Sequence, residues 1–163
     1  MWKLPVGLLA LAGFALMVFW GLQKSEASRS LPSDITLTNM QNEMVALSDF
    51  EGQPVIINFW ATWCPPCIRE MPLLARYAEK EGFALVLINQ AESVETIQAY
   101  LDEAGLEFEY MLLDSHQIAY QAMQVRGLPT TQFFNAEGGL VNEHLGEVHD
   151  RHLDTFIKGH VQL

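Results

Sequence analysis

Cys64 and Cys67, separated by two residues, directly follow an apolar run of strand length, and this juxtaposition restricts the possible folds more than any other feature. The run PVIINFW, at 54–60, has almost no polar positions, which favours a central strand covered on both faces. The chain has no other cysteine, and a bridge across two residues would constrain the unfolded chain very little. The cysteine pair therefore indicates reactivity rather than structural cross-linking.

The composition is that of one folded domain behind an apolar leader. Half of the 163 residues are apolar and 18% are charged, which excludes disorder for most of the chain. About 130 residues remain after the leader, enough for a single core. The net charge of -11, from 20 Asp+Glu against 9 Lys+Arg, would repel phosphate backbones. We therefore expect no nucleic acid partner.

The two prolines between the cysteines prepare the start of a helix. Each proline disfavours the helical conformation of the residue before it, so the helix is expected to begin near Pro66, with Cys64 just ahead of it. Unpaired N–H groups and the helix dipole stabilise a thiolate at that place. The sequence thus predicts Cys64 as the nucleophile and Cys67, in the first turn, as the resolving thiol.

The amino-terminal segment predicts a membrane anchor. Residues 5–22 carry no charge and would span roughly 27 Å as a helix, enough to cross a bilayer core. We assign 1–23 to the anchor, 24–33 to a tether and 34–163 to the folded domain. A cleaved signal peptide is the alternative, because Ser25-Glu26-Ala27 has the small residues that a signal peptidase prefers. The flanking charges do not decide the orientation.

Hydrophobic periodicity predicts the order βαβαβαββα after a short hairpin. Parallel crossovers ending in an antiparallel hairpin give a mixed sheet flanked by helices. Strands are expected at 35–40, 44–47, 54–60, 83–89, 110–113, 130–135 and 140–145, and helices from the cysteine motif to about 81, around 94–104, at 115–124 and from about 150.

At this point the sequence resembles the membrane-tethered thioredoxin-like proteins of the TlpA and ResA type. Two motifs about sixty residues apart carry the resemblance, NFWATWCPPC at 58–67, followed by Glu70 and Pro72, and GLPTT at 127–131. It covers roughly residue 31 to the carboxyl end. The resemblance implies an α/β thioredoxin-like fold with an added amino-terminal β-hairpin and one transmembrane helix. It also implies a catalytic domain on the periplasmic side of a bacterial inner membrane.

The resemblance also implies an activity and its partners. Members of this family usually reduce disulfides of exported proteins during cytochrome c or oxidase maturation. We therefore expect a protein-disulfide reductase without a cofactor, acting on apocytochrome c or an oxidase subunit. Reduction outside the cytoplasm requires electrons from a membrane protein of the DsbD or CcdA kind.

The resemblance assigns roles to further residues. Glu70 follows Cys67 by one helical turn and is expected to exchange a proton with it, because Asn58 stands where ordinary thioredoxins carry a buried aspartate. Trp63, Pro65 and the Leu128–Pro129 peptide, which is cis in this family, are expected to contact bound substrate.

Two other functions remain as alternatives. A general disulfide oxidase would use the same cysteines in the opposite direction, and motif alone does not set the reduction potential. Copper delivery, known in relatives of this fold, uses a wider cysteine spacing and a histidine. The five histidines fit no metal spacing with the cysteines, so we predict no metal site.

Overall fold

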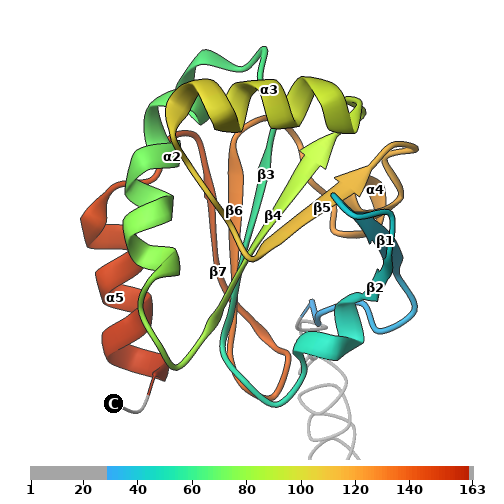
Figure 1. Ribbon diagram of the computed structural model, residues 1–163. Coiled ribbons are helices and arrows are strands. Elements are labelled where there is room, and N and C mark those ends of the chain that lie inside the picture. The colour runs from blue at the N-terminus through green and yellow to red at the C-terminus, as the bar shows by residue number, and fades with distance from the viewer. Residues whose placement is uncertain (1–28, 162–163) are drawn as a thin grey trace, which may run out of the picture.

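The computed structural model describes residues 29–161 (Figure 1). Within that range, no helix is long and apolar enough to cross a membrane. The expected anchor at 1–23 and the first part of the expected tether lie outside the described residues.

One mixed sheet of seven strands forms the centre of the molecule (Figure 1). Its order is β2-β1-β5-β4-β3-β6-β7, with β3, β4 and β5 parallel and the other pairings antiparallel. The elements are β1 (Thr36–Asn39), β2 (Met44–Ala46), the 3-10 helix η1 (Leu47–Phe50), β3 (Val55–Trp60), α2 (Pro65–Ala78), β4 (Ala84–Gln90), α3 (Val94–Ala104), β5 (Tyr110–Asp114), α4 (Ile118–Ala122), β6 (Thr130–Phe134), β7 (Leu140–Leu145) and α5 (Asp150–His160).

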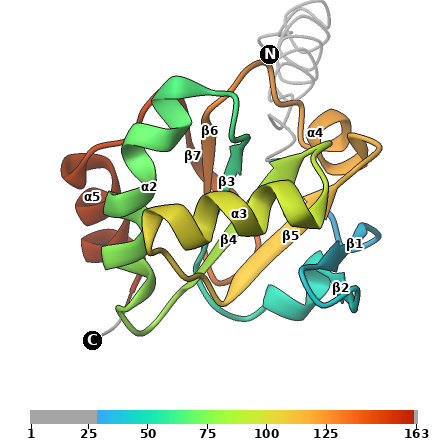
Figure 2. The same ribbon diagram turned by 45° about the horizontal axis from the view of Figure 1, so that its top comes forward.

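Two apolar cores lie on opposite faces of the sheet, because successive side chains of a strand point to opposite sides. Helices α2, α3 and α5 cover one face, where they pack on residues such as Ile56 and Trp60 of β3. In Figure 2, α3 runs across β4 and β5, with α2 and α5 beside it. The other face carries Ile57 and Phe59 and is covered by η1, α4 and the residues that precede β1. Every residue of β3 is buried, as the apolar run predicts.

The structure confirms the expected α/β thioredoxin-like fold, including the added amino-terminal hairpin of β1 and β2. Two helices are shorter than the sequence predicts. Helix α2 ends at Ala78 rather than near 81, and α4 occupies 118–122 rather than 115–124. The residues Gln117 and Gln124, which flank α4, have left-handed backbone conformations and therefore end the helix.

The described chain begins packed against the end of the sheet that lies away from the cysteines. Leu31 is buried, and its N–H donates to the carbonyl of Gly138, in the turn between β6 and β7, at 2.8 Å. The N–H of Leu140 donates to the carbonyl of Arg29 at 2.7 Å. Residues 29–31 were expected in the tether, but they pair with the domain.

Candidate active site

Cys64 and Cys67 form a disulfide at the amino end of α2, with Cα atoms 5.3 Å apart. Cys64 is the residue that caps the helix, and its Sγ accepts the backbone N–H of Cys67 at 3.3 Å. Pro65 is the first residue of the helix, one position earlier than expected, where its missing N–H costs no hydrogen bond. Cys64 is 4% exposed and Cys67 is fully buried. The helix terminus therefore directs one backbone N–H, that of Cys67, at the sulfur of Cys64.

A carboxylate that follows the neighbouring strand β4 holds the turn between β3 and Cys64. Glu92, after β4, accepts the backbone N–H of Thr62 at 2.7 Å and also the Thr62 hydroxyl. Asn89 at the end of β4 donates to the same carboxylate at 2.8 Å. Parallel pairing of β3 with β4 brings these groups together, because Trp60 lies opposite Asn89. Glu92 thus positions the turn that carries the first cysteine.

Glu70 is a buried carboxyl group, only 1% exposed, on the inner side of α2. Its Oε1 accepts the Nδ2 of Asn58 at 2.7 Å, and its Oε2 accepts the backbone N–H of Val148 at 2.7 Å. Burial raises the pKa of Glu70 from 4.5 to about 7, although both hydrogen bonds lower it and nearby Glu147 raises it further. Glu70 can therefore hold or release a proton near neutral pH.

Asn58 links Glu70 to the adjacent strand β6. It is fully buried on β3, and its Nδ2 also donates to the hydroxyl of Thr131 at 2.9 Å. Its Oδ1 is buried and has no hydrogen-bond partner among the described residues. The sequence predicts that Asn58 leaves proton transfer to Glu70, and the structure places the two side chains in direct contact.

The Leu128–Pro129 peptide is cis and lies at the same edge of the sheet as the cysteines. Thr130, the next residue, pairs with Phe59 near the end of β3, so the start of β6 meets the strand that leads to Cys64. Pro129 is buried and Leu128 is half-buried, packed against the core cluster that contains both cysteines. The expected cis conformation is confirmed.

Apolar side chains at this edge remain open to solvent. Trp63 is 66% exposed and Leu145, at the end of β7, is 55% exposed. Pro65 is also exposed. Leu145 lies opposite Thr130 in the pairing of β6 with β7. The exposure of Trp63 shows that this side chain is not part of the core.

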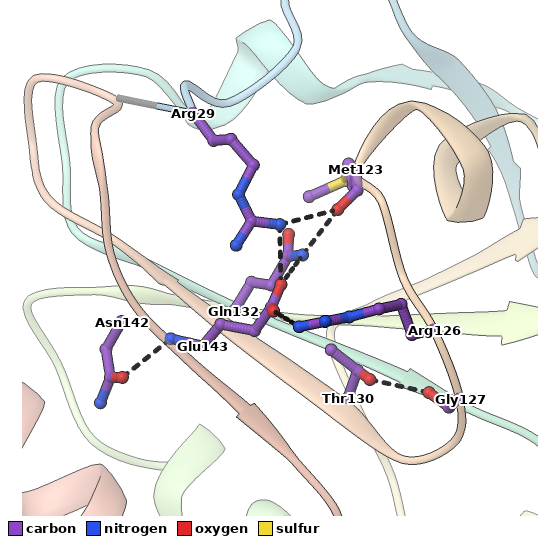
Figure 3. A network of polar contacts seen from close by, with 8 residues as sticks. All are labelled: Arg29, Met123, Arg126, Gly127, Thr130, Gln132, Asn142 and Glu143. Atoms are coloured by element: carbon purple, nitrogen blue, oxygen red, sulfur yellow. Dashed lines mark hydrogen bonds and ion pairs between the residues drawn. The ribbon is translucent and has the colours of Figure 1, made fainter. Parts of the chain in front are cut away.

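A second carboxylate network lies on the other face of β6 (Figure 3). Glu143 of β7 accepts Gln132 Nε2 at 2.7 Å, Arg29 Nη1 at 2.9 Å and Arg126 Nη2 at 3.4 Å. Burial raises the pKa of Glu143, but the hydrogen bonds from Arg29 and Gln132 outweigh it and hold the pKa below its usual range. Gln132 and Arg29 both also donate to the carbonyl of Met123. The network ties the start of the described chain to the loop that leads to Pro129.

The comparisons with known proteins agree with this geometry. Residues 29–142 match the model of the AhpC/TSA family. The thiol-disulfide oxidoreductase ResA of Halalkalibacterium halodurans is 33% identical over 128 residues, which cover 77% of this chain and 72% of that protein. ResA of Bacillus subtilis is 32% identical over 127 residues, covering 76% and 70%. The chain belongs to the AhpC/TSA family, as a ResA-like thiol-disulfide oxidoreductase.

A solved structure of the same fold supports the architecture. A secreted Mycobacterium tuberculosis disulfide oxidoreductase homologous to Escherichia coli DsbE superposes with a TM-score of 0.67 at 23% identity. The match covers 77% of this chain and 95% of that protein.

The structure brings the predicted residues Cys64, Cys67, Glu70 and Asn58 onto one side of β3. Sequence reasoning missed Glu92 and Val148, which position the turn and the carboxyl group. Thr131 lay within the quoted GLPTT motif, but no pattern in the sequence linked it to Asn58. A contact between Val148 and Glu70 joins residues 78 positions apart, and no local spacing reports such a contact.

Proposed function

We propose that this protein reduces disulfides of exported proteins through a Cys64–Cys67 dithiol, in the manner of cytochrome c or oxidase maturation. One observation carries the proposal. Cys64 caps a helix whose first free N–H, that of Cys67, donates to the Cys64 sulfur, and a carboxyl group with a pKa near 7 lies one turn beyond Cys67. That arrangement supplies a stabilised thiolate and a proton carrier for the second thiol.

The reaction proceeds by two exchanges. The Cys64 thiolate attacks one sulfur of the substrate disulfide, a mixed disulfide forms, and the other substrate sulfur leaves and takes a proton. Cys67 then loses its proton and attacks Cys64 Sγ, which releases the first substrate sulfur as a thiol. The substrate gains two electrons and two protons, and the protein ends as the Cys64–Cys67 disulfide that the structure contains.

Glu70 serves the second exchange. It follows Cys67 by three residues, on the same side of α2, and in its ionised form it accepts the Cys67 proton. The fully buried Cys67 has little access to water, so a buried carboxyl group is the natural recipient. Asn58 holds Glu70 at 2.7 Å but cannot itself take the proton.

The exposed apolar edge suits an unfolded or flexible protein substrate. Trp63, Pro65, Leu128 and Pro129 would contact the polypeptide that carries the substrate disulfide. The apolar segment at 1–23 would anchor the chain in a bacterial inner membrane with the domain on the periplasmic side. A membrane protein of the DsbD or CcdA kind would then return two electrons to the disulfide.

Trapping the mixed disulfide tests this function. With Cys67→Ser, Cys64 still attacks a substrate but nothing resolves the complex, so partners should accumulate in adducts that a reductant cleaves. Cys64→Ser is the matched control and should trap little, because the remaining thiol is fully buried. Both variants should be expressed as the full chain, with its amino-terminal segment.

The identity of the trapped partner separates the candidate substrates. Apocytochrome c would support a role in haem attachment, and a copper-site subunit would support oxidase assembly. Many unrelated exported proteins, trapped together with an oxidising partner, would favour the general oxidase. Absence of any adduct from Cys67→Ser, while the unmodified protein is active, would refute the roles given to the two cysteines.

A further inference from the structure

Asn58 uses only half of its hydrogen-bonding capacity, although it is fully buried. Its Nδ2 donates both to Glu70 Oε1 at 2.7 Å and to Thr131 Oγ1 at 2.9 Å, while its Oδ1 has no partner within residues 29–161. A buried acceptor without a partner is unfavourable. The observed orientation is nevertheless the one that an ionised Glu70 requires, because a carboxylate can only accept.

Protonation of Glu70 reverses that requirement. The backbone N–H of Val148 can only donate, so Oε2 must remain an acceptor toward it. The proton of a neutral Glu70 is therefore expected on Oε1, the oxygen that faces Asn58. There it would meet the NH₂ group of Asn58, and two donors cannot bond each other.

A half-turn of the Asn58 carboxamide removes this conflict. It brings Oδ1, which lacks a partner, to the place of Nδ2, within reach of both Glu70 and Thr131. Oδ1 can accept two hydrogen bonds, and the Thr131 hydroxyl can donate as well as accept. The same three side chains thus bond the carboxyl group in either form, and in each orientation the end of the Asn58 amide that faces away from Glu70 is the one without a partner among the described residues.

We propose that the Asn58 carboxamide turns over when Glu70 takes up a proton, so that Asn58 and Thr131 are positioning residues that bond the carboxyl group in both protonation states. The proposal deepens the proton role given to Glu70 above and rests on it for its functional meaning. As a consequence, Glu70 can take up and release a proton without a change in its own position, because the Asn58 carboxamide rotates instead.

The charges around Glu70 favour such exchange near neutral pH. In the part of the chain that the structure describes, no cation is bonded to the carboxyl group, and Asn58 of β3 and Thr131 of β6 are neutral. Glu147, in the loop after β7, faces it, and the guanidinium of Arg69 on α2 bonds Glu147 at 2.8 Å. His144 of β7 lies opposite Thr131 in the sheet and contacts the carbonyl of Glu147. On α2 itself, the remaining titratable neighbour is Cys67, bonded in the disulfide.

Gln132 provides an internal control, because it is also a buried amide of β6 that donates to a carboxylate (Figure 3). Its partner Glu143 is bonded to Arg29 and Arg126. The pKa of Glu143 lies below its usual range, so this carboxyl group stays ionised at neutral pH. Gln132 also donates to the carbonyl of Met123. No proton arrives near neutral pH to turn this amide.

The test follows the side-chain NH₂ groups by NMR in the oxidised, isotope-labelled full chain in detergent micelles, between about pH 5 and about pH 9. At high pH the Asn58 NH₂ protons should show cross-relaxation with the Thr131 methyl group. At low pH these cross-peaks should be lost, with the same midpoint as the Glu70 carboxyl carbon shift. The Gln132 NH₂ cross-peaks should not change over this range.

Glu70→Gln gives a second measurement, independent of titration. Its amide oxygen can accept from Val148, and its NH₂ then faces Asn58, which must present Oδ1 at every pH. The low-pH pattern of Asn58 should therefore persist throughout. Cross-peaks that stay constant while the Glu70 carbon titrates would overturn the amide rotation but leave the proton role of Glu70 intact. That role would fail separately, if Glu70→Gln left the pH profile of disulfide exchange unchanged.

Discussion

Glu70 and Glu143 are both largely buried carboxyl groups, yet their surroundings move their pKa values in opposite directions. Glu70 is bonded by an amide and a backbone N–H, so burial dominates and its pKa rises to about 7. Glu143 has two arginines beside it, and its pKa falls. A neutral hydrogen-bond donor orients a carboxyl group without fixing its charge, whereas a guanidinium fixes both. Only the first arrangement suits a proton carrier.

The raised pKa predicts a pH-dependent loss of stability that Glu70→Gln should remove. The unfolded chain ionises Glu70 near pH 4.5 and the folded protein only near pH 7, so the stability contributed by the neutral group is lost as the pH rises between these values. Between about pH 4.5 and pH 7.5, the free energy of unfolding of Glu70→Gln should rise by up to about 3 kcal/mol relative to that of the unmodified protein. Denaturant unfolding of the oxidised proteins at several pH values measures this difference.

Glu143→Gln serves as the contrasting variant. The Glu143 pKa is lowered, so its contribution is present above the unfolded pKa and lost only in acid. This variant should therefore be less stable than the unmodified protein at neutral pH. Unfolding curves of Glu70→Gln and the unmodified protein that stay parallel from acid to neutral pH would contradict the assignment of Glu70.

The sequence predicts which residues gather at the candidate site better than it predicts their environment. The cysteine spacing and the proline pair predict Cys64 as the nucleophile, and helical spacing predicts that Glu70 lies on the same side of the helix as Cys67. The burial of Glu70 does not follow from that spacing, because an isolated helical glutamate is usually solvated. Its burial depends on Val148, which the chain supplies only after β7. Sequence patterns report local periodicity, and contacts of this kind are set by the tertiary fold.

At the scale of elements, the turn of residues 61–63 joins the central strand to the catalytic helix. The carbonyl of Ala61 accepts the N–H of Cys64 at 3.2 Å, so the turn fixes the position of Cys64 relative to the end of β3. Glu92 fixes the middle of the turn through both polar groups of Thr62. The position of Cys64 thus depends on a loop that follows the neighbouring strand.

Removal of the Glu92 carboxylate should loosen this turn. A hydrogen bond to a charged group contributes about 1.5–3 kcal/mol, so Glu92→Ala should increase amide exchange at Thr62 by about tenfold or more. Ser93→Ala is the matched control, because Ser93 caps α3 through the N–H of Thr96 and does not bond the turn. Hydrogen exchange at Thr62 should stay unchanged in that variant. Equal protection of Thr62 in all three proteins would show that Glu92 does not hold the turn.

Element types and order were predictable because the long segments have clear patterns, either a continuous apolar run or a helical period. The buried run of β3 and the 3.6-residue period of α3, closed by Gly105 in a left-handed conformation, match the structure. The expected helix at 115–124 shortened because both oxygens of Asp114 accept backbone N–H groups at its start. Such side-chain capping competes with regular helix, and a period over few residues cannot reveal it.

At the scale of the whole molecule, the chain enters the domain at one end of the sheet and reacts at the other. Ser30 bridges to Gly139 beside the turn between β6 and β7, while β3 delivers Cys64 to the opposite edge. Arg29 extends along β7 to Glu143, and Glu143 also contacts Arg126, in the loop before Pro129 (Figure 3). This network connects the start of the described chain to the loop that leads to Pro129.

The two arginines of this network should contribute unequally to stability. Arg29 Nη1 lies 2.9 Å from Glu143 and its side chain is 35% exposed, whereas Arg126 Nη2 lies at 3.4 Å and is 78% exposed. Exposed ion pairs contribute little because water screens them and the long side chain loses entropy. Double-mutant cycles with Glu143→Gln should therefore give a coupling of roughly 1 kcal/mol or more for Arg29→Met and below about 0.5 kcal/mol for Arg126→Met.

Denaturant unfolding of the oxidised full chain at neutral pH measures both cycles. The larger coupling of Arg29 should weaken below the pH at which Glu143 takes up a proton, since the lowered pKa of Glu143 derives in part from Arg29. Arg126→Met is the control for loss of a positive charge, because both variants change the net charge equally. Equal couplings for the two arginines would mean that Glu143 is stabilised by the total positive charge nearby and not by a specific contact with Arg29. In that case the contact at 2.9 Å would not fix the entry of the chain to the sheet.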